Sequence, residues 1–277
     1  LLSGTPTGGK YERLWSQCQL LGWDISKRLF YSQFVEQETC SIWARGRMQY
    51  FNKIVGYKNV DRLIYKLRQH GATFLKTDDI FNLPEQNFID IKVDVTPQYK
   101  KFKSERIVDF DGVTLVGDTT LTAMLYERML CSQYNKAKLQ AFADLLDSTD
   151  DRLIVFYNYN DELKHLQKIC GERPISTING NVKDLNNYNN EDNSITFVQY
   201  QSGAMGLNLQ KANKIIYFSL PLSSELFEQS KKRTHRIGQS RPCFYYVMTC
   251  HNSIEEKILE TLKMRQDYTE RLFVNNN

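Results

Sequence analysis

Two arginines near the C-terminal end of the chain have a spacing that suits phosphate chemistry. They are Arg233 and Arg236 in the stretch EQSKKRTHRIGQSRP, residues 228–242. Because they are three residues apart, a helical turn would present both guanidinium groups on one side, and Gly238 and Pro242 would end that turn. A guanidinium there can bind a phosphate through two hydrogen bonds and stabilise γ-phosphoryl charge, worth roughly 10³ to 10⁵ in rate. Charge pattern alone favours the alternative, a solvated basic helix.

A second stretch, QSGAMGLNL, combines two glycines with small polar neighbours. Gly203 and Gly206 are three residues apart, and Gln201, Ser202 and Asn208 lie beside them. The backbone N–H groups of glycines can approach a phosphate closely. On its own, such a loop favours the simpler interpretation of a tight turn.

The third stretch, LLSGTP, stands at the start of the chain. It places Ser3 and Thr5 where a short apolar strand would run into a loop. Alone it fits any cap or turn. A helix is expected after it, around residues 12–21.

The second half of the chain contains the elements that would position these residues. From about residue 131 to 277, short β-branched stretches alternate with helical patterns, which predicts an α/β domain whose parallel sheet carries helices on both faces. The predicted strands are RLIVFY, PISTING, SITFVQ, KIIYFS and CFYYVMTC. Ser253 and Glu256 have capping-box spacing at the start of a last helix whose apolar stripe would pack on the sheet. The Asn-rich stretch LNNYNNEDN is expected to be a loop.

The segment upstream is predicted to be mostly helical. KNVDRLIYKLRQHG predicts a helix capped by Asn59, and the alternation in FIDIKVDV predicts a half-buried strand. Thr96 would cap the helix that follows the strand. IVDFDGVTLVGD predicts a hairpin that turns at Asp111-Gly112, and two helices are expected near 121–130 and 136–147.

Composition bounds the partners and the compartment. The 277 residues include 36 basic and 32 acidic side chains, a net charge of only +4, so a polyanion must be bound by a local patch. The six cysteines form no C-x-x-C and have no nearby His pair, which argues against a zinc site or a disulfide framework and favours a reducing compartment. No apolar run reaches the ~18 residues of a membrane span, and no signal peptide is visible. We therefore expect a cytoplasmic protein, or a nuclear one if eukaryotic.

Taken together and in this order, the three stretches resemble the motifs of helicase-like ATPases in the SWI/SNF family of DNA translocases. GAMGLNL is similar to the fifth motif, and LLSGTP with Leu14-Trp15 to the third motif and its sequel. GYKNVDRLIYKLRQHGATFLKTDDIFNLPEQ is similar to the stretch between the lobes. The sixth motif is the most specific match, at Gln229, Arg233, His235, Arg236, Ile237, Gly238, Gln239, Arg241 and Pro242.

This resemblance implies a fold of two RecA-like lobes, with the nucleotide between them and DNA across both. The first lobe of the family carries a Walker loop for the phosphates and an acidic box for magnesium, and no G-x-x-x-x-G-K-[ST] occurs in this sequence. ATP and Mg²⁺ are therefore expected to be bound mainly by an absent first lobe, so that this chain alone is inactive. The opening Leu1 fits a piece of a longer protein. We expect the end of the first lobe at 1–40, a mostly helical inter-lobe insertion with a small hairpin at 41–130, and the second RecA-like lobe with a C-terminal brace helix at 131–277.

The resemblance also assigns expected roles to individual residues. Arg233 and Arg236 would stabilise the γ-phosphate charge of ATP. The residues expected near the nucleotide or in lobe coupling are Gly206, Asn208, Gln229, Ser3 and Thr5, and those expected at the DNA backbone are Gln201, Ser202 and Asn158. No metal ligand is expected. Gln201 departs from the family, which has Arg or Lys there, and so does the Asn-rich loop, which stands where the family has a helix with an Arg.

The expected partner is the backbone of double-stranded DNA, bound without regard to sequence by a monomer, with a protein partner in a replication, recombination or repair assembly. The rival hypothesis is a non-catalytic lobe that docks DNA or protein in a larger assembly, which Gln201 favours and the intact arginine pair opposes. A Walker loop and an Asp-Glu box upstream of Leu1 would discriminate in favour of the enzyme. Another helicase-like branch is disfavoured by Gln239, where unwinding branches often carry Arg. The compact insertion fits a phage or bacterial member.

Overall fold

The chain folds into two units, and a computed structural model describes each of them by itself. The described residues are 7–44, 46–74, 81–110, 112–203 and 206–271. The smaller unit comprises residues 1–80 with 264–277, and the larger unit comprises residues 81–263. No helix among the described residues is both long and apolar enough to span a membrane.

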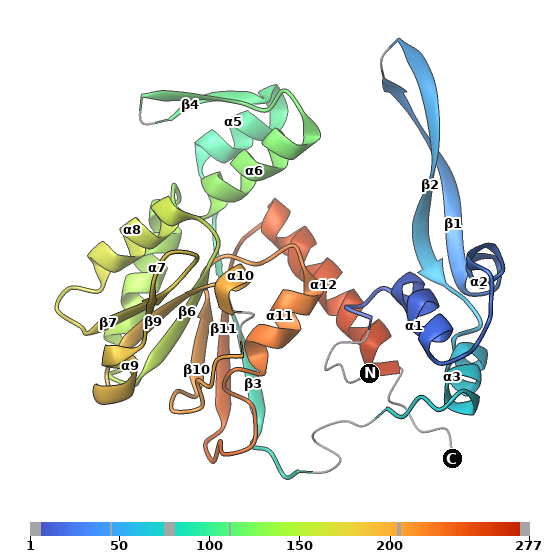
Figure 1. Cartoon of the computed structure of the whole chain (residues 1–277). Helices are drawn as coiled ribbons and strands as arrows, with labels where there is room; N and C mark the ends of the chain where they lie inside the picture. The colour runs from blue at the N-terminus through green and yellow to red at the C-terminus, as the bar shows by residue number, and fades with distance from the viewer. Residues whose placement is uncertain (1–6, 45, 75–80, 111, 204–205, 272–277) are drawn as a thin grey trace. The chain divides into compact units, whose positions relative to one another are not determined.

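A seven-stranded sheet forms the centre of the larger unit (Figure 1). Six strands are parallel, and only the last pair is antiparallel. From one edge to the other the strands are β3 (Gln86–Val93), β11 (Cys243–Cys250), β10 (Lys214–Tyr217), β6 (Leu153–Tyr157), β9 (Ile195–Gln199), β7 (Ile175–Ile178) and β8 (Lys183–Asp184). The predicted α/β fold class with a parallel RecA-like sheet is thereby confirmed.

Helices cover both faces of this sheet, which is why its central strands are apolar on both sides. All five residues of β6 are buried, and they alternate between two cores. Ile154 and Phe156 pack with α11 (Ser224–Lys231) and the first part of α12 (Ile254–Arg271). Leu153 and Val155 pack with α7 (Lys136–Asp147) and α8 (Asn160–Ile169).

The segment after β8 differs from its expected form. Residues Asn186–Asn190, predicted as part of an Asn-rich loop, form the short helix α9, and Tyr188, which is only 1% exposed, is its anchor in the core. The Tyr188 N–H donates to Oγ of Ser176 at 3.0 Å. Burial of one tyrosine therefore overrides the weak helix propensity of asparagine.

The strand predicted from FIDIKVDV is an edge strand of the same sheet. β3 pairs with β11 in parallel along its whole length, from Gln86 opposite Cys243 to Val93 opposite Cys250. We expected it between the lobes, within 41–130, because its alternating pattern gives no sign of its partner. In the second half of β3 the alternation is visible in the burial: Asp90 and Lys92 are exposed, and Ile91 and Val93 are partly buried.

A small helical layer with a hairpin follows β3. Thr96 caps α5 (Pro97–Glu105) as predicted, with its Oγ1 accepting the Tyr99 N–H at 3.2 Å. The predicted hairpin is confirmed as β4 (Ile107–Phe110) and β5 (Val113–Val116), an antiparallel pair. α6 (Thr120–Cys131) completes the layer, whose core includes Tyr99, Phe102, Val108, Leu115 and Ala123.

The smaller unit packs short helices around the base of a long hairpin. In chain order its elements are η1 (Tyr11–Arg13), α1 (Leu14–Leu20), α2 (Lys27–Phe34), β1 (Val35–Ala44), β2 (Arg47–Tyr57) and α3 (Val60–Gln69). Its core contains Tyr11, Leu14, Phe30, Phe34 and Leu63. The β1–β2 hairpin was not expected from the sequence, because its strands show no consistent apolar face.

The helix predicted after residue 59 is present as α3, but its cap works differently. Asn59 has a left-handed backbone, φ 52°, and makes no side-chain cap to the helix. Its Nδ2 instead donates to the Gln33 carbonyl at 2.8 Å. Asn59 thus ties α3 to the end of α2.

Candidate functional site

The two arginines singled out by their spacing lie just beyond a helix, not on one. α11 ends at Lys231, and the chain continues through turns that hold Arg233 and Arg236. The Arg233 carbonyl accepts the Leu209 N–H at 3.1 Å, a tertiary bond that replaces the next intrahelical one. Turn hydrogen bonds continue past the end of α11, from the Arg233 N–H to the Ser230 carbonyl at 3.2 Å and from the His235 N–H to the Lys231 carbonyl at 3.2 Å.

The guanidinium groups of this pair are near one another, with no acidic partner. Nη1 of Arg236 donates to Oδ1 of Asn208. Arg233 is half-buried, and its Nε is buried without a hydrogen-bond partner. Burial lowers the pKa of Arg233, and the charge of Arg236 lowers that pKa further. Across the ranges that the structure describes, neither arginine pairs with a carboxylate.

A buried glutamine joins the arginine segment to the glycine-rich segment. Nε2 of Gln239 donates to the carbonyls of Gln210, at 3.1 Å, and Ala212, at 2.9 Å. Its Oε1 accepts the Arg241 N–H at 3.1 Å. Gly238 turns the chain with φ 98°, in the region that favours glycine. Sequence reasoning treated Gln239 as a family marker only, because its partners lie almost 30 residues upstream.

Two further contacts fix the same segment. A ring nitrogen of His235, Nε2, lies 2.9 Å from the Pro84 carbonyl. Nη2 of Arg241 donates to the Lys211 carbonyl at 2.6 Å. The arginine segment is therefore held by hydrogen bonds between the two arginines, at His235, and after them, at Gln239 and Arg241.

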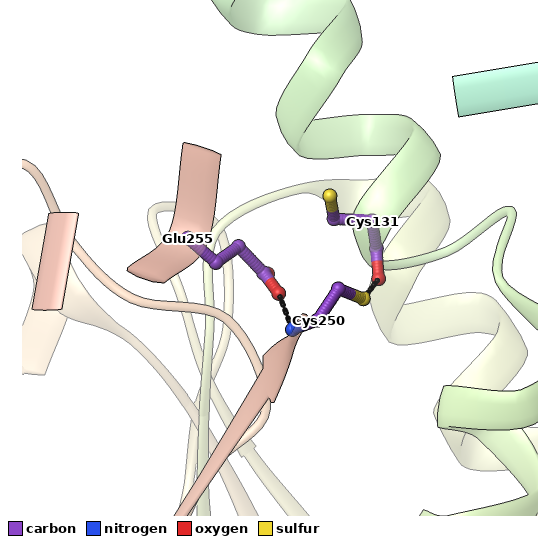
Figure 2. Close-up of side chains that lie close together, drawn as sticks. All are labelled: Cys131, Cys250 and Glu255. Carbon is purple, nitrogen blue, oxygen red and sulfur yellow. Dashed lines mark hydrogen bonds between the residues drawn. The ribbon is translucent and has the colours of Figure 1, made fainter. Parts of the chain in front are cut away.

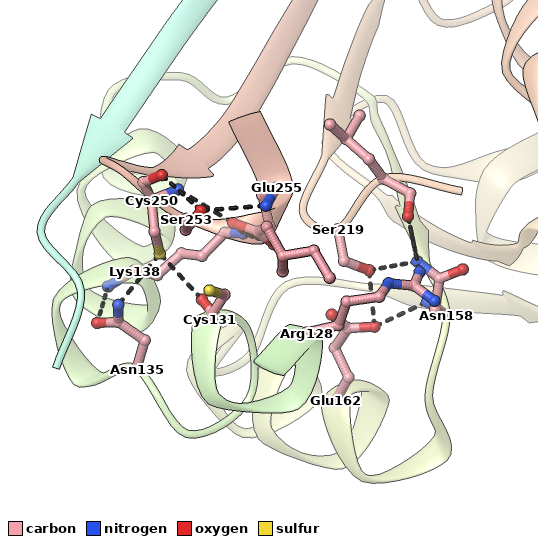
Figure 3. Close-up of polar contacts among 12 residues, drawn as sticks. Arg128, Cys131, Asn135, Lys138, Asn158, Glu162, Ser219, Cys250, Ser253 and Glu255 are labelled. Carbon is pink, nitrogen blue, oxygen red and sulfur yellow. Dashed lines mark hydrogen bonds and ion pairs between the residues drawn. The ribbon is translucent and has the colours of Figure 1, made fainter. Parts of the chain in front are cut away.

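Asn158 belongs to a different network, at the carboxyl ends of β6 and β10. Its Nδ2 donates to Oγ of Ser219 at 2.7 Å and to the Leu220 carbonyl at 3.2 Å (Figure 3). Its backbone N–H donates to Oε2 of Glu162 at 2.7 Å. Burial raises the pKa of Glu162, and the N–H donors oppose that shift. The amide N–H groups of Asn158 thus serve the fold, and a DNA phosphate, which only accepts hydrogen bonds, would have to displace one of their partners.

The remaining predicted residues lie on other segments or outside the described ranges. Gln201 and Ser202 are on α10 (Tyr200–Gly203), directly after β9, with Gln201 exposed. Gln229 donates to Oε1 of Glu225 on its own helix at 3.3 Å. Gly206 is exposed and has φ 51°. Ser3 and Thr5 fall outside the described residues.

Sequence comparisons relate this geometry to known proteins. Residues 137–238 match the family model described as "Helicase conserved C-terminal domain". An "Uncharacterized ATP-dependent helicase" of Mycoplasma pneumoniae is 23% identical over 99% of the chain, and a "DNA repair and recombination protein RAD54-like" of Drosophila willistoni is 26% identical over 48%. The "ATP-dependent helicase fft1" of Schizosaccharomyces pombe is 27% identical over 45%. Residues 137–238 are thus similar to a helicase C-terminal domain.

The chain matches only part of each relative. The aligned regions span 28%, 18% and 14% of those three proteins. Because the relatives come from a bacterium, a fly and a yeast, they do not support the expected phage or bacterial origin. The structure titled "Crystal structure of the C-terminal part of Fun30 ATPase domain" resembles this one with a TM-score of 0.49 at 12% identity, over 69% of this chain and 97% of that one.

A buried ion pair connects two helices of the larger unit. Nζ of Lys138 lies 2.6 and 2.8 Å from the two carboxylate oxygens of Glu255, and both side chains are almost fully buried (Figure 3). Oε2 of Glu255 also accepts the Cys250 N–H at 3.0 Å (Figure 2). The pair joins the start of α7 to the start of α12.

Two cysteines lie beside this carboxylate and raise the question of a metal. The ligand atoms of Cys131, Cys250 and Glu255 lie within 4.8 Å of one another (Figure 2). The ammonium of Lys138 already takes both oxygens of Glu255, and burial raises the pKa of Cys131 well above its usual value, which keeps it a thiol. The group is therefore better suited to bracing than to binding a cation.

Proposed function

We propose that this chain is the C-terminal part of an ATP-dependent translocase on double-stranded DNA, in which Arg233 and Arg236 stabilise charge on the γ-phosphate of ATP. The observation that carries the proposal is a pair of interacting guanidinium groups with no carboxylate partner among the described residues, in which Arg236 is held by Asn208 and Arg233 keeps an unpaired, buried Nε. Such a pair is complementary to a highly charged anion. The relatives named as ATP-dependent helicases supply the identity of that anion.

The two arginines would share the work unequally. Arg236 is oriented by Asn208, so its remaining N–H groups are aimed before the phosphate arrives. Arg233 is half-buried and has an unpaired Nε, so a phosphate oxygen would gain a donor that water hardly reaches. A first lobe would hold ATP and Mg²⁺ through its own phosphate-binding loop and acidic box, and this chain's residues would supply the positive charge opposite them.

Coupling to DNA would pass through the rigid connection between the two segments. Leu209, Asn208 and Gln239 tie the glycine-rich segment to the arginine segment. If phosphate binding displaces the arginine segment, these hydrogen bonds would move the glycine-rich segment with it. That segment follows α10, where Gln201 and Ser202 would contact the DNA backbone. Gly206, Gln229, Ser3 and Thr5 are proposed to take part in lobe coupling. Asn158 would contact a DNA phosphate only by turning an Nδ2 N–H away from Ser219 or Leu220. Repeated closure and opening of two lobes would then move the DNA.

DNA binding by this machinery should not depend on sequence. The proposed contacts are to phosphates, which position a protein without reading bases, and their affinity should fall as salt rises. A relative named as a DNA repair and recombination protein is consistent with this use. Monomeric action inside a repair or recombination assembly is part of the proposal.

The test needs the protein with its first lobe. Arg236→Ala should lower DNA-stimulated ATP hydrolysis by roughly 10³-fold or more, as for other arginine fingers, while DNA binding stays within about twofold because the γ-phosphate is a separate ligand. Arg28→Ala, which removes an exposed arginine of α2, is the matched control and should keep normal turnover. Normal turnover in Arg236→Ala would sink the proposed role and favour the docking-platform hypothesis.

A further inference from the structure

The outer part of the β1–β2 hairpin exposes an unusual number of aromatic and apolar side chains. We call the described residues 39–43 and 46–52 the hairpin tip. Trp43 is 68% exposed and Tyr50 is 73% exposed, and Ile42, Met48 and Phe51 are also exposed. No member of the hairpin tip belongs to a core cluster. Exposed apolar surface of this size marks a binding site.

These side chains lie on both faces of the hairpin. The register pairs Trp43 with Met48 and, two positions on, Ser41 with Tyr50, so Trp43, Met48 and Tyr50 share one face. The intervening pairs place Ile42 and Phe51 on the other face. A protein partner that covers one face would leave the other exposed. Flat groups that stack on either side of the hairpin suit both faces at once.

The charged residues of this region favour a negatively charged partner. Residues 39–52 contain two arginines, Arg45 and Arg47, and no Asp or Glu. The first acidic residue towards the base is Glu38, which faces Lys53 across the strands. Aromatic side chains interleaved with uncompensated positive charge are the composition of surfaces that bind single-stranded nucleic acid, where bases stack on the rings and cations meet the phosphates.

The base of the hairpin is rigid enough to present such a surface. Val35 and Ile54 pack in the core of the smaller unit. Oη of Tyr57 donates to Oε2 of Glu12. Between this anchor and the turn at Gly46, φ 73°, the two strands pair at ten positions with one irregularity after Glu36. The tip is thus held away from its core on an ordered ladder.

We propose that the hairpin tip binds unpaired DNA bases, with Trp43 and Tyr50 stacking on one side and Phe51 on the other, and Arg47 contacting phosphate. This is a second DNA contact, separate from the backbone contacts of the larger unit. The choice of DNA as the polymer rests on the proposed function. A hairpin with this surface would engage a strand where the duplex opens, so forks and junctions would be preferred to continuous duplex.

The test measures binding of the whole 277-residue chain, without ATP, to labelled oligo(dT) and to a blunt duplex of equal length. The double variant Trp43→Ala/Tyr50→Ala should bind oligo(dT) about fivefold or more weakly and change duplex binding by less than about twofold. Tyr65→Ala removes an exposed tyrosine of α3 and is the matched control. Equal oligo(dT) affinity in the double variant and the control would overturn the proposal, as would the absence of oligo(dT) binding by the unmodified chain.

A second measurement does not depend on how well the alanine variant folds. Oligo(dT) should quench the fluorescence of the unmodified chain, and Trp43→Phe should abolish most of that quenching while keeping near-normal affinity, because Trp15 and Trp23 are half-buried. Quenching that persists in Trp43→Phe contradicts stacking at the tip. Loss of self-association in Trp43→Ala/Tyr50→Ala, with unchanged oligo(dT) binding, would assign the surface to a second copy of the chain instead. These binding measurements are made without ATP, so a negative result would contradict the role of the hairpin tip but not the proposed role of Arg236 in ATP hydrolysis.

Discussion

Replacing Lys138 tests how much the buried ion pair contributes to the larger unit. The Lys138→Met variant keeps the length of the side chain but leaves the Glu255 carboxylate buried without its cation. Both side chains are almost fully buried, and the variant loses the two contacts from Nζ of Lys138 to the carboxylate oxygens of Glu255, at 2.6 and 2.8 Å. Removal of one partner of such a pair costs about 3–5 kcal/mol. For a unit of this size that corresponds to a fall in Tm of roughly 6–20 °C.

A second variant separates the pair from its burial. In Lys138→Met/Glu255→Leu no charge remains, and the main loss is the acceptor of the Cys250 N–H, worth about 1–3 kcal/mol. The double variant should therefore be more stable than Lys138→Met. Lys164→Met is the matched surface control, because its partner Asp161 is more than half exposed and the pair is worth about 0–1 kcal/mol.

The pH dependence of Lys138→Met has a definite sign. Burial already raises the pKa of Glu255 above its ordinary value, and loss of the lysine raises the pKa further. A carboxyl whose pKa is raised on folding favours the folded state below its unfolded pKa, and this contribution is lost as pH rises towards the folded pKa. The deficit of Lys138→Met relative to the unmodified chain should thus be smaller at about pH 5 than at about pH 8. Thermal unfolding followed by far-UV circular dichroism at the two pH values measures both the loss of stability and its change with pH. A deficit that is below about 1 kcal/mol, or that grows on acidification, would refute the reasoning.

Three further outcomes are expected. Gln239→Ala leaves the buried Ala212 carbonyl and the partly buried Gln210 carbonyl without their donor, so it should cost about 1–3 kcal/mol in urea unfolding. It should also slow DNA-stimulated hydrolysis by the protein with its first lobe, and Arg241→Ala, whose contact is more exposed, should have a smaller effect on both. Thr96→Ala should cost about 1 kcal/mol and Thr96→Ser much less, since serine keeps the cap oxygen; equal losses would contradict the cap. The 277-residue chain alone should hydrolyse negligible ATP in a phosphate-release assay, and robust hydrolysis would contradict the half-site argument.

The parallel sheet could be predicted because its strands are buried on both faces. β6, β9 and β10 are short, largely apolar runs in the sequence. The same residues therefore indicate both that the segment is a strand and that it is buried. β3 was recognised as a strand from its alternation, but its place beside β11 depends on pairing over about 150 residues of sequence. Local patterns carry no information on such a partner.

The candidate site was predictable in its residues but not in its geometry. The types and spacing of Arg233 and Arg236 pointed to a phosphate, and their roles stay predictions. The hydrogen bond from the Leu209 N–H to the Arg233 carbonyl could not be foreseen, because the two residues are 24 positions apart. The contribution of Gln239 was missed for the same reason. The hairpin tip gave no strand signal because its apolar residues face solvent on both sides instead of a core.

The position of β3 bears on how this protein can be divided in the laboratory. The family model begins at residue 137, and a version cut to 131–277 would retain every strand of the sheet except β3. β11 would then lose eight residues of parallel pairing, from Cys243 to Cys250. Its row of open N–H and C=O groups, on a strand that reads CFYYVMTC, would be a template for intermolecular strand addition. A soluble version of the larger unit should therefore begin before Gln86.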